Sequence, residues 1–359
     1  MKFLLYDFPS LDEYIIFREL SLETKRCALA NDIKSLSEIY DSVIVNRIQN
    51  RQLRRIASNS FGEKQINPRD VVNLCANKIQ QKIFFKSKNL PTADFALPGL
   101  PENRDNDVIE IFMKRVQKEI GDMPWVIKPT ESGRGNSVIT VYNRDDLERY
   151  WDNCIALKRS EANIQGPIVE KLIPHPFDLR VVLSFYDNKT NIVAILARVA
   201  EKQERIAKNT SRGSIPIGIF ELPEQYINLI RQIYFPNSIV GLDIIPLSDK
   251  DPNKIYSLSS ILYIEWLRLV EKRGEKKINL REDYSDYLRH LENIYDQFKR
   301  SKNYELLQRA VYDYLSGSKP YFVEINDRPD FAYNTRLLAL RQGNEITEEM
   351  KKILLRLNS

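Results

Sequence analysis

The segment YFVEINDRP (321–329) decides the fold, because its apolar, strand-like pattern carries polar groups at a spacing of two. On a strand, Glu324 and Asn326 project from the same face. The run IVGLDII (239–245) is equally apolar and contains Asp243. If the two strands are neighbours, these three side chains offer the hard oxygen ligands that Mg²⁺ takes in proteins. The alternative is three polar residues on an exposed sheet face, but an unpartnered carboxylate is costly to bury in so apolar a run.

A helical stretch separates these two strands in the sequence. Residues 251–318 show helical patterns near 261–272, 284–298 and 304–315, and Gly274 ends the first of them. We therefore interpret 251–318 as an insertion between two neighbouring strands. Its leucine and tyrosine stripes are typical of helices that pack against a core or form a dimer surface.

Upstream of the insertion, strands first alternate with helices and then dominate. The alternation over residues 1–90 predicts a small α/β lobe, and a loop rich in Pro and Gly over 91–101 marks its end. We expect helical structure within 11–29, after Pro68 and over 108–120. Together these patterns predict an α/β (α+β) fold with three parts, 1–90, 91–167 and 168–359. The predicted strands cover 2–6, 43–45, 125–129, 138–142, 168–170, 179–185, 192–198, 238–245 and 321–325.

The composition of the chain limits the classes of ligand and the compartment that we expect for it. The chain has 359 residues, with Lys+Arg 54 against Asp+Glu 49 and a net charge of +5. That small excess suits a local anionic ligand better than a nucleic-acid-coating surface. No apolar run approaches the roughly 18 residues of a membrane span, and the N-terminus lacks the pattern of a signal peptide. Three scattered cysteines without CxxC spacing favour reduced thiols and a cytoplasmic protein.

Only two histidines are present, His175 and His290, which argues against a histidine-based metal site or a Ser-His-Asp triad. The chemistry must then rest on carboxylates, lysines, arginines and backbone amides. Lys128 follows a buried-type strand and precedes a loop with Ser132, Gly133 and Gly135, whose backbone amides can approach phosphate oxygens. A surface hairpin with a glycine tip is the commoner explanation. For Lys78, on a helix with an apolar face, the plain alternative is a solvated lysine.

Two further groups have the right chemistry for a nucleotide. Asp178 and Arg180 share a strand face, either as an ion pair or as a ribose acceptor beside an anion clamp. Glu170, with Lys171 and Leu172 after it, offers an acceptor and backbone groups to the edge of an adenine. The stretch from Arg198 to Gly213 is cationic and is either a solvated loop or part of a site. It contains Arg198, Arg205, Lys208, Asn209 and Arg212.

The order of these pieces resembles that of the ATP-grasp ligases, particularly the RimK-like branch, which joins amino acids to carboxylates. The resemblance covers roughly residues 40–335 except the insertion. The segments that carry it are NPRDVVNLCANK (67–78), LPTADF (90–95), MPWVIKPTESGRGNSVITV (123–141), GPIVEKLIPHPFDLRVVL (166–183), AKNTSRG (207–213), SIVGLDIIP (238–246) and YFVEINDRPDF (321–331).

The resemblance implies a fold and a set of roles. The fold would have an N-terminal pre-ATP-grasp lobe, a central lid subdomain and a C-terminal subdomain that together clasp ATP. Two Mg²⁺ ions, for which Mn²⁺ can substitute, would sit on Asp243, Glu324 and Asn326. The other implied roles are phosphate contacts from Lys78, Lys128 and the 131–137 loop, adenine contacts from Glu170, Lys171 and Leu172, a ribose contact from Asp178, a γ-phosphate contact from Asn209, and stabilisation of the reacting acyl group by Arg180 and Arg212.

Four departures from the family pattern stand out. Asp330 replaces a glycine, so the loop there runs differently or presents an extra charge to the substrate. Ala207 stands where a positive residue is common, which Arg205 or Lys208 can replace. The N-terminal lobe matches poorly, and the 251–318 insertion has no counterpart in compact members. None of these changes removes a metal ligand.

The resemblance implies an ATP- and Mg-dependent carboxylate–amine ligase that forms an amide or peptide bond through an acyl phosphate. Its partners would be a small-molecule, peptide or protein carboxylate and an amino acid amine, with an acidic acceptor favoured by the basic residues near the site. We expect no nucleic acid or membrane partner, and a homodimer or homotetramer as in relatives. The insertion would shape the amine-acceptor pocket or dock a protein or carrier substrate. The alternatives are an ATP-grasp small-molecule kinase and a non-catalytic nucleotide-binding scaffold.

Overall fold

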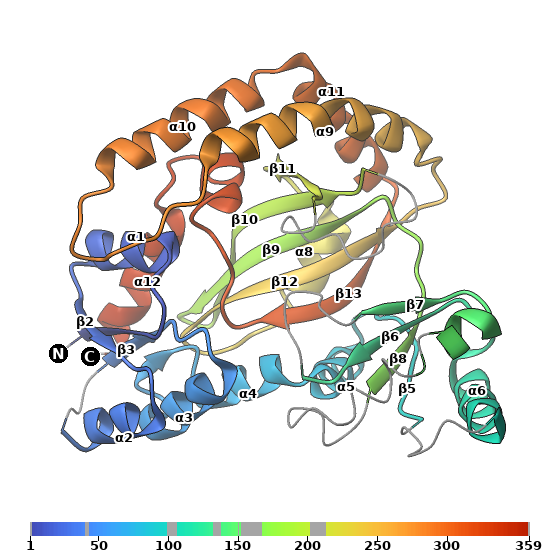
Figure 1. Ribbon diagram of the computed structural model, residues 1–359, viewed down its shortest axis with the longest axis horizontal. Helices are drawn as coiled ribbons and strands as arrows, with labels where there is room; N and C mark the ends of the chain where they lie inside the picture. The colour runs from blue at the N-terminus through green and yellow to red at the C-terminus, as the bar shows by residue number, and fades with distance from the viewer. Residues whose placement is uncertain are drawn as a thin grey trace.

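Three β-sheets organise the part of the chain that the structure describes (Figure 1). The computed structural model describes residues 2–39, 43–98, 106–131, 138–149, 151, 167–201 and 213–357. Among these residues, no helix has the length and apolar character needed to cross a membrane. The mixed α/β architecture predicted from the sequence is confirmed.

The N-terminal sheet is parallel and has the strand order β2-β1-β3-β4. Its inner strands read as continuous apolar runs because helices cover them on both sides. One prediction here is wrong: helical structure over 11–29 breaks at Ser21, which has a φ of 50°, and a polar edge strand follows it. The elements are β1 (Lys2–Tyr6), α1 (Leu11–Leu20), β2 (Glu23–Arg26), α2 (Ala30–Ile39), β3 (Val43–Asn46), α3 (Arg51–Phe61) and β4 (Gln65–Ile66).

Two helices lead from this sheet to the second one. They are α4 (Arg69–Ala76) and α5 (Lys78–Ser87), and Asn77 between them caps α5 by accepting hydrogen bonds from the N–H groups of Ile79 and Gln80. The second, small sheet has the antiparallel order β5-β8-β6-β7 and packs on α6. Its elements are β5 (Phe95–Ala96), α6 (Asn106–Ile120), β6 (Trp125–Pro129), β7 (Ile139–Val141) and β8 (Pro167–Lys171).

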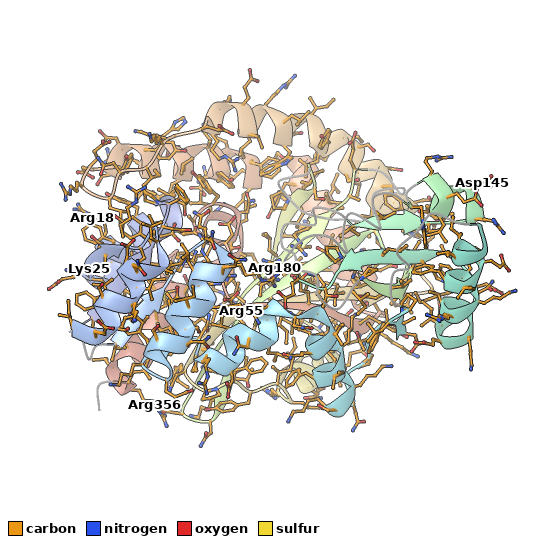
Figure 2. The ribbon with its side chains drawn as sticks, turned by 60° about the horizontal axis from the view of Figure 1, so that its bottom comes forward. Arg18, Lys25, Arg55, Asp145, Arg180 and Arg356 are labelled. Carbon is orange, nitrogen blue, oxygen red and sulfur yellow. The ribbon has the colours of Figure 1, made fainter. Side chains whose placement is uncertain are left out.

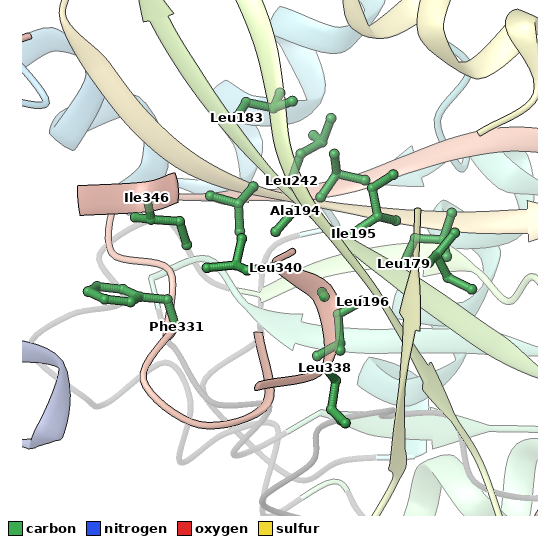
Figure 3. Close-up of a cluster of buried hydrophobic side chains, with 14 of the residues drawn as sticks. Leu179, Leu183, Ala194, Ile195, Leu196, Leu242, Phe331, Leu338, Leu340 and Ile346 are labelled. Atoms are coloured by element: carbon green, nitrogen blue, oxygen red, sulfur yellow. The ribbon is translucent and has the colours of Figure 1, made fainter. Parts of the chain in front are cut away.

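The large sheet is antiparallel throughout, with the order β11-β10-β9-β12-β13. Figure 3 shows part of its core, to which Leu179, Leu196 and Leu242 of the sheet and Leu338 and Leu340 of the C-terminal segment belong. Its elements are β9 (Phe177–Tyr186), β10 (Lys189–Val199), β11 (Ile215–Ile219), α8 (Glu224–Ile230), β12 (Ser238–Leu247), β13 (Lys319–Asn326), the π-helix η2 (Thr335–Ala339) and α12 (Glu345–Arg356).

The insertion between β12 and β13 is confirmed. It contains α9 (Asn253–Arg273), α10 (Ser285–Lys299) and α11 (Lys302–Leu315), which arch over one side of the large sheet (Figure 1). The helices belong to the main core, because Trp266, Tyr295 and Tyr304 are buried. The Gly218 N–H of β11 also donates to the Tyr304 hydroxyl at 2.8 Å. The insertion is therefore an integral layer of the fold.

Candidate functional site

A cavity of about 570 Å³ is lined by residues of the small and large sheets, of α1 and α5, and of loops that include the one after β3. Glu170 of β8 lies on its wall from the small sheet, and Asp243 of β12 and Glu324 of β13 contribute from the large sheet. Arg47, directly after β3, lines it from the N-terminal part. Figure 2 shows Arg180 near the middle of the molecule, between the N-terminal elements and the small sheet. The sequence-predicted residues that the structure describes therefore gather around one space.

Strand register brings the three expected metal ligands together. Asp243 pairs directly with Glu324 across β12 and β13, and Asn326 pairs with Gly241 two residues away. The Asn326 side-chain amide nitrogen is buried without a hydrogen-bond partner. The Lys78 ammonium lies 3.8 Å from the Glu324 carboxylate, which is too far for a hydrogen bond. Two carboxylates and one amide are the donor types that Mg²⁺ prefers. No group of three or more His, Cys, Asp or Glu side chains in the described residues is arranged to hold a metal.

Asp243 is also the centre of a buried charge network. Arg180 donates to both of its carboxylate oxygens, through Nε and, at 2.9 Å, through Nη2. Arg198 of β10 reaches the same carboxylate at 3.1 Å and donates to Asp178 at 2.5 Å. Burial acts to raise the pKa of Asp243, but the two guanidinium groups hold it below its usual value. A cation bound here would share Asp243 with two arginines.

This network corrects one expectation. Asp178 and Arg180 share a strand face but do not pair with each other: each finds its partner on the neighbouring strand. Register explains the choice, since Arg180 lies opposite Asp243 and Arg198 lies opposite Asp178. Burial raises the pKa of Asp178 despite its contact with Arg198. The sequence predicts Arg198 at the end of a strand and the start of a cationic stretch, and the strand pairing shows its place in the site.

Gly241 provides space for Arg180. A Cβ atom at Gly241 would lie 3.0 Å from the Arg180 Cδ and 3.2 Å from the Pro329 Cβ. Because Gly241 has no side chain, the Arg180 side chain of the neighbouring strand β9 can pass over it to reach Asp243.

On the small-sheet side of the cavity, one carboxylate oxygen contacts two lysines. Oε2 of Glu170 lies 2.9 Å from the Lys128 ammonium and 3.1 Å from that of Lys82. Burial acts to raise the pKa of Glu170, but Lys128 and Lys82 lower it to about 2. The other oxygen, Oε1, is buried without a hydrogen-bond partner. The sequence analysis missed Lys82, although its position four residues after Lys78 places it on the same face of α5.

The backbone groups next to Glu170 are partly used inside the protein. The Lys171 N–H donates to the Asp94 carbonyl at 2.9 Å, and the Leu172 N–H donates to the Pro124 carbonyl at 3.1 Å. Both residues line the cavity, but these two N–H groups are not available to a base edge. Lys78 lies one turn before Lys82, and burial lowers its pKa while Glu324 opposes that effect.

The far end of the cavity has a mixed-charge wall. Arg47 is buried and pairs with Asp12 at 2.8 Å and Glu13 at 3.0 Å, and Arg328 pairs with Glu13 at 3.1 Å. Asp330 also lines the cavity. The arginines here are thus balanced by internal carboxylates, which weakens the sequence argument for an acidic acceptor. Five expected site residues lie outside the described residues: Ser132, Gly133, Gly135, Asn209 and Arg212.

Comparisons with known proteins identify the fold. No protein-family model matches the chain, and neither does any curated protein. Among solved structures, it is similar to D-cycloserine synthetase (11% identity, 99% of this chain and 100% of that one, TM-score 0.57). It is also similar to D-alanine–D-alanine ligase from Bacillus anthracis (14% identity, 99% and 98%, TM-score 0.53).

A third similar structure is the biotin carboxylase domain of 2-oxoglutarate carboxylase from Hydrogenobacter thermophilus, in complex with MgADP, ADP and bicarbonate. The match has 16% identity and a TM-score of 0.51, and it covers 68% of this chain and 60% of that one. At these identities the similarity establishes the fold alone. The chain has the ATP-grasp fold, as expected from its motifs.

Proposed function

We propose that this protein is an ATP- and Mg-dependent carboxylate–amine ligase that forms an amide or peptide bond through an acyl phosphate. The observation that carries the proposal is that Glu170, the oxygens of Asp243, Glu324 and Asn326, and the arginines Arg180 and Arg198 all line the same cavity. Two of the similar structures support it, because one is a D-alanine–D-alanine ligase by name and another holds MgADP. The RimK-like subtype and the domain boundaries at 90/91 and 167/168 belong to this proposal.

We assign a different role to each group of residues along the cavity. Glu170 faces the base, while Lys78 and Lys128 supply positive charge to the phosphates. Asp243, Glu324 and Asn326 would hold Mg²⁺, which neutralises charge on the transferring phosphoryl group. Arg180 lies beside Asp243 and is placed to stabilise the oxyanion when an amine attacks the acyl phosphate. We also assign Ser132, Gly133, Gly135, Asn209 and Arg212 the phosphate and acyl-group roles that the resemblance implies.

The test is release of phosphate from Mg-ATP, screened over pairs of carboxylates and amines. We expect release that depends on both substrates and falls at least about 100-fold in Glu324→Gln, since one uncharged amide replaces a metal-binding carboxylate. Asp313→Asn is the matched control, because Asp313 is exposed and lies outside the cavity lining. A phosphorylated product without free phosphate would identify a kinase. ATP binding without turnover of any pair would favour a scaffold.

A further inference from the structure

Glu170 is held asymmetrically. Both lysines contact Oε2, and Oε1 is buried, has no hydrogen-bond partner and belongs to a residue on the cavity wall. An unpartnered carboxylate oxygen at a cavity wall is costly unless a ligand donates a hydrogen bond to it. The exocyclic amino group of adenine is such a donor. A 6-oxo purine, such as hypoxanthine, offers an acceptor at the same place.

The two lysines are not equivalent. The Lys128 side chain is 14% exposed and lies on β6, whereas the Lys82 side chain is 1% exposed and lies on α5. Lys82 also donates to the Thr92 hydroxyl at 2.9 Å, and that hydroxyl donates to the Phe322 carbonyl of β13 at 2.7 Å. Lys82 is therefore fixed between α5, the segment before β5 and the large sheet.

When phosphates are present, they attract Lys128. A lysine that turns toward phosphate weakens its contact with Glu170. Lys82 then remains as the close cation beside a carboxylate that is 4% exposed. Without any close cation, burial acts to raise the pKa of Glu170 and so favours its protonated form. A protonated carboxyl can donate as well as accept, so it would no longer distinguish an amino group from an oxo group.

We propose that Lys82 is the positioning residue that keeps Glu170 an ionised, acceptor-only group for the 6-amino group of the adenine base. The inference rests on the proposed nucleotide-binding function and adds the residue that sets base selectivity. In this proposal Lys82 acts through Glu170, whose Oε2 it contacts at 3.1 Å.

The experiment compares binding of ADP and inosine diphosphate, which carry an amino group and an oxo group at the purine 6 position, with N1 protonated in the oxo form. We expect wild-type protein to bind ADP at least about tenfold more tightly, because the buried acceptor is left unpaired by the oxo group. In Lys82→Met, ADP binding should weaken and inosine diphosphate binding should strengthen, so that the ratio falls about tenfold or more. Lys82→Arg retains the positive charge and should retain selectivity.

Lys88→Met is the control, because Lys88 is an exposed lysine at the C-terminal end of α5. Lys82→Gln provides a second neutral variant if the methionine variant does not fold. A pH series separates selectivity from structural damage: raising the pH ionises Glu170 again and should restore ADP preference in Lys82→Met. The groups that act on Glu170 in that titration are Lys128, the more distant Lys78, and the Glu324 carboxylate, which acts through Lys78.

The outcomes separate the two proposals. Wild-type protein that binds neither nucleotide would overturn the proposed function. Selective wild-type binding with an unchanged ratio in both neutral variants would overturn only the role of Lys82. An equal loss of both nucleotides, without recovery of selectivity at higher pH, would show that Lys82 supports the structure alone.

Discussion

At the scale of single residues, Gly241 shows how a missing side chain positions a charge. The Arg180 guanidinium donates hydrogen bonds to Asp243, and the Arg180 side chain passes close to Gly241. A Cβ atom at Gly241 would lie 3.0 Å from the Arg180 Cδ. Such a contact is too close for an unstrained pair of carbon atoms. The sequence marks this position as a glycine in an apolar strand, but it does not say which side chain needs the space.

We expect Gly241→Ala to displace Arg180 from Asp243. The added methyl should reduce the free energy of unfolding by about 1–2 kcal/mol through crowding, and it should reduce turnover about tenfold or more because the buried guanidinium moves. Chemical denaturation and steady-state kinetics measure the two effects. Gly317→Ala adds a methyl at a similar distance, 3.1 Å from the Lys250 Cε, outside the cavity lining. Equal turnover in the two variants would contradict this role for Gly241.

At the scale of elements, the β12–β13 pair was predictable and the remainder of the site was less so. Spacing by two and apolar flanks identify Glu324, Asn326 and Asp243 as strand residues, and the register confirms that they meet. Arg198 and Lys82 could not be placed by such reasoning, because each reaches the site through a partner on another element. Local patterns specify the face on which a side chain lies, whereas ion pairs across elements depend on tertiary register.

The insertion illustrates the same limit. Its helices were predictable from their periodicity, but no residue of 251–318 lines the cavity as the structure describes it. The helices of the insertion instead contact residues that line the cavity. The Tyr295 hydroxyl of α10 donates to the Asn334 side chain at 2.8 Å, and the Arg273 guanidinium lies 4.7 Å from the Tyr333 ring centre. Asn334 and Tyr333 both line the cavity, so the insertion supports its wall from behind.

Tyr295→Phe should therefore loosen the far end of the cavity without unfolding the protein. Loss of one hydrogen bond should cost about 1 kcal/mol of stability. We expect the KM of the second substrate to rise severalfold while the Kd of ADP stays the same, because Glu170 and Lys128 lie at the other end. Tyr312→Phe is the control: its hydroxyl accepts from the Phe220 N–H at 2.8 Å, and neither residue lines the cavity. An equal rise in KM in Tyr312→Phe would show that the effect does not depend on the hydrogen bond between Tyr295 and Asn334.

At the scale of the whole molecule, the cavity lies between two of the three hydrophobic cores that the described residues form. One core runs continuously from the N-terminal sheet through the large sheet to the insertion and includes Leu4, Leu242 and Trp266. The small sheet and α6 have their own core, which includes Trp125 and Trp151. The sequence predicted lobes around a nucleotide, but not that the first and last lobes share one core. That sharing depends on long-range packing, which no local pattern contains.

Two cores joined across a cavity should unfold separately until a ligand couples them. The chain's three tryptophans report on both, because Trp125 and Trp151 lie in the small core and Trp266 lies in the large one. In urea, we expect the fluorescence midpoints of Trp266→Phe and of a Trp125→Phe, Trp151→Phe double variant to differ. MgADP at about 100 times its Kd should stabilise the coupled state by about 2.7 kcal/mol and bring the midpoints together. Circular dichroism of each variant must match wild type, so that the substitutions themselves are not the cause. Midpoints that coincide without nucleotide would mean that the cores already unfold as one unit, and midpoints that stay apart with MgADP would mean that the nucleotide does not bridge them.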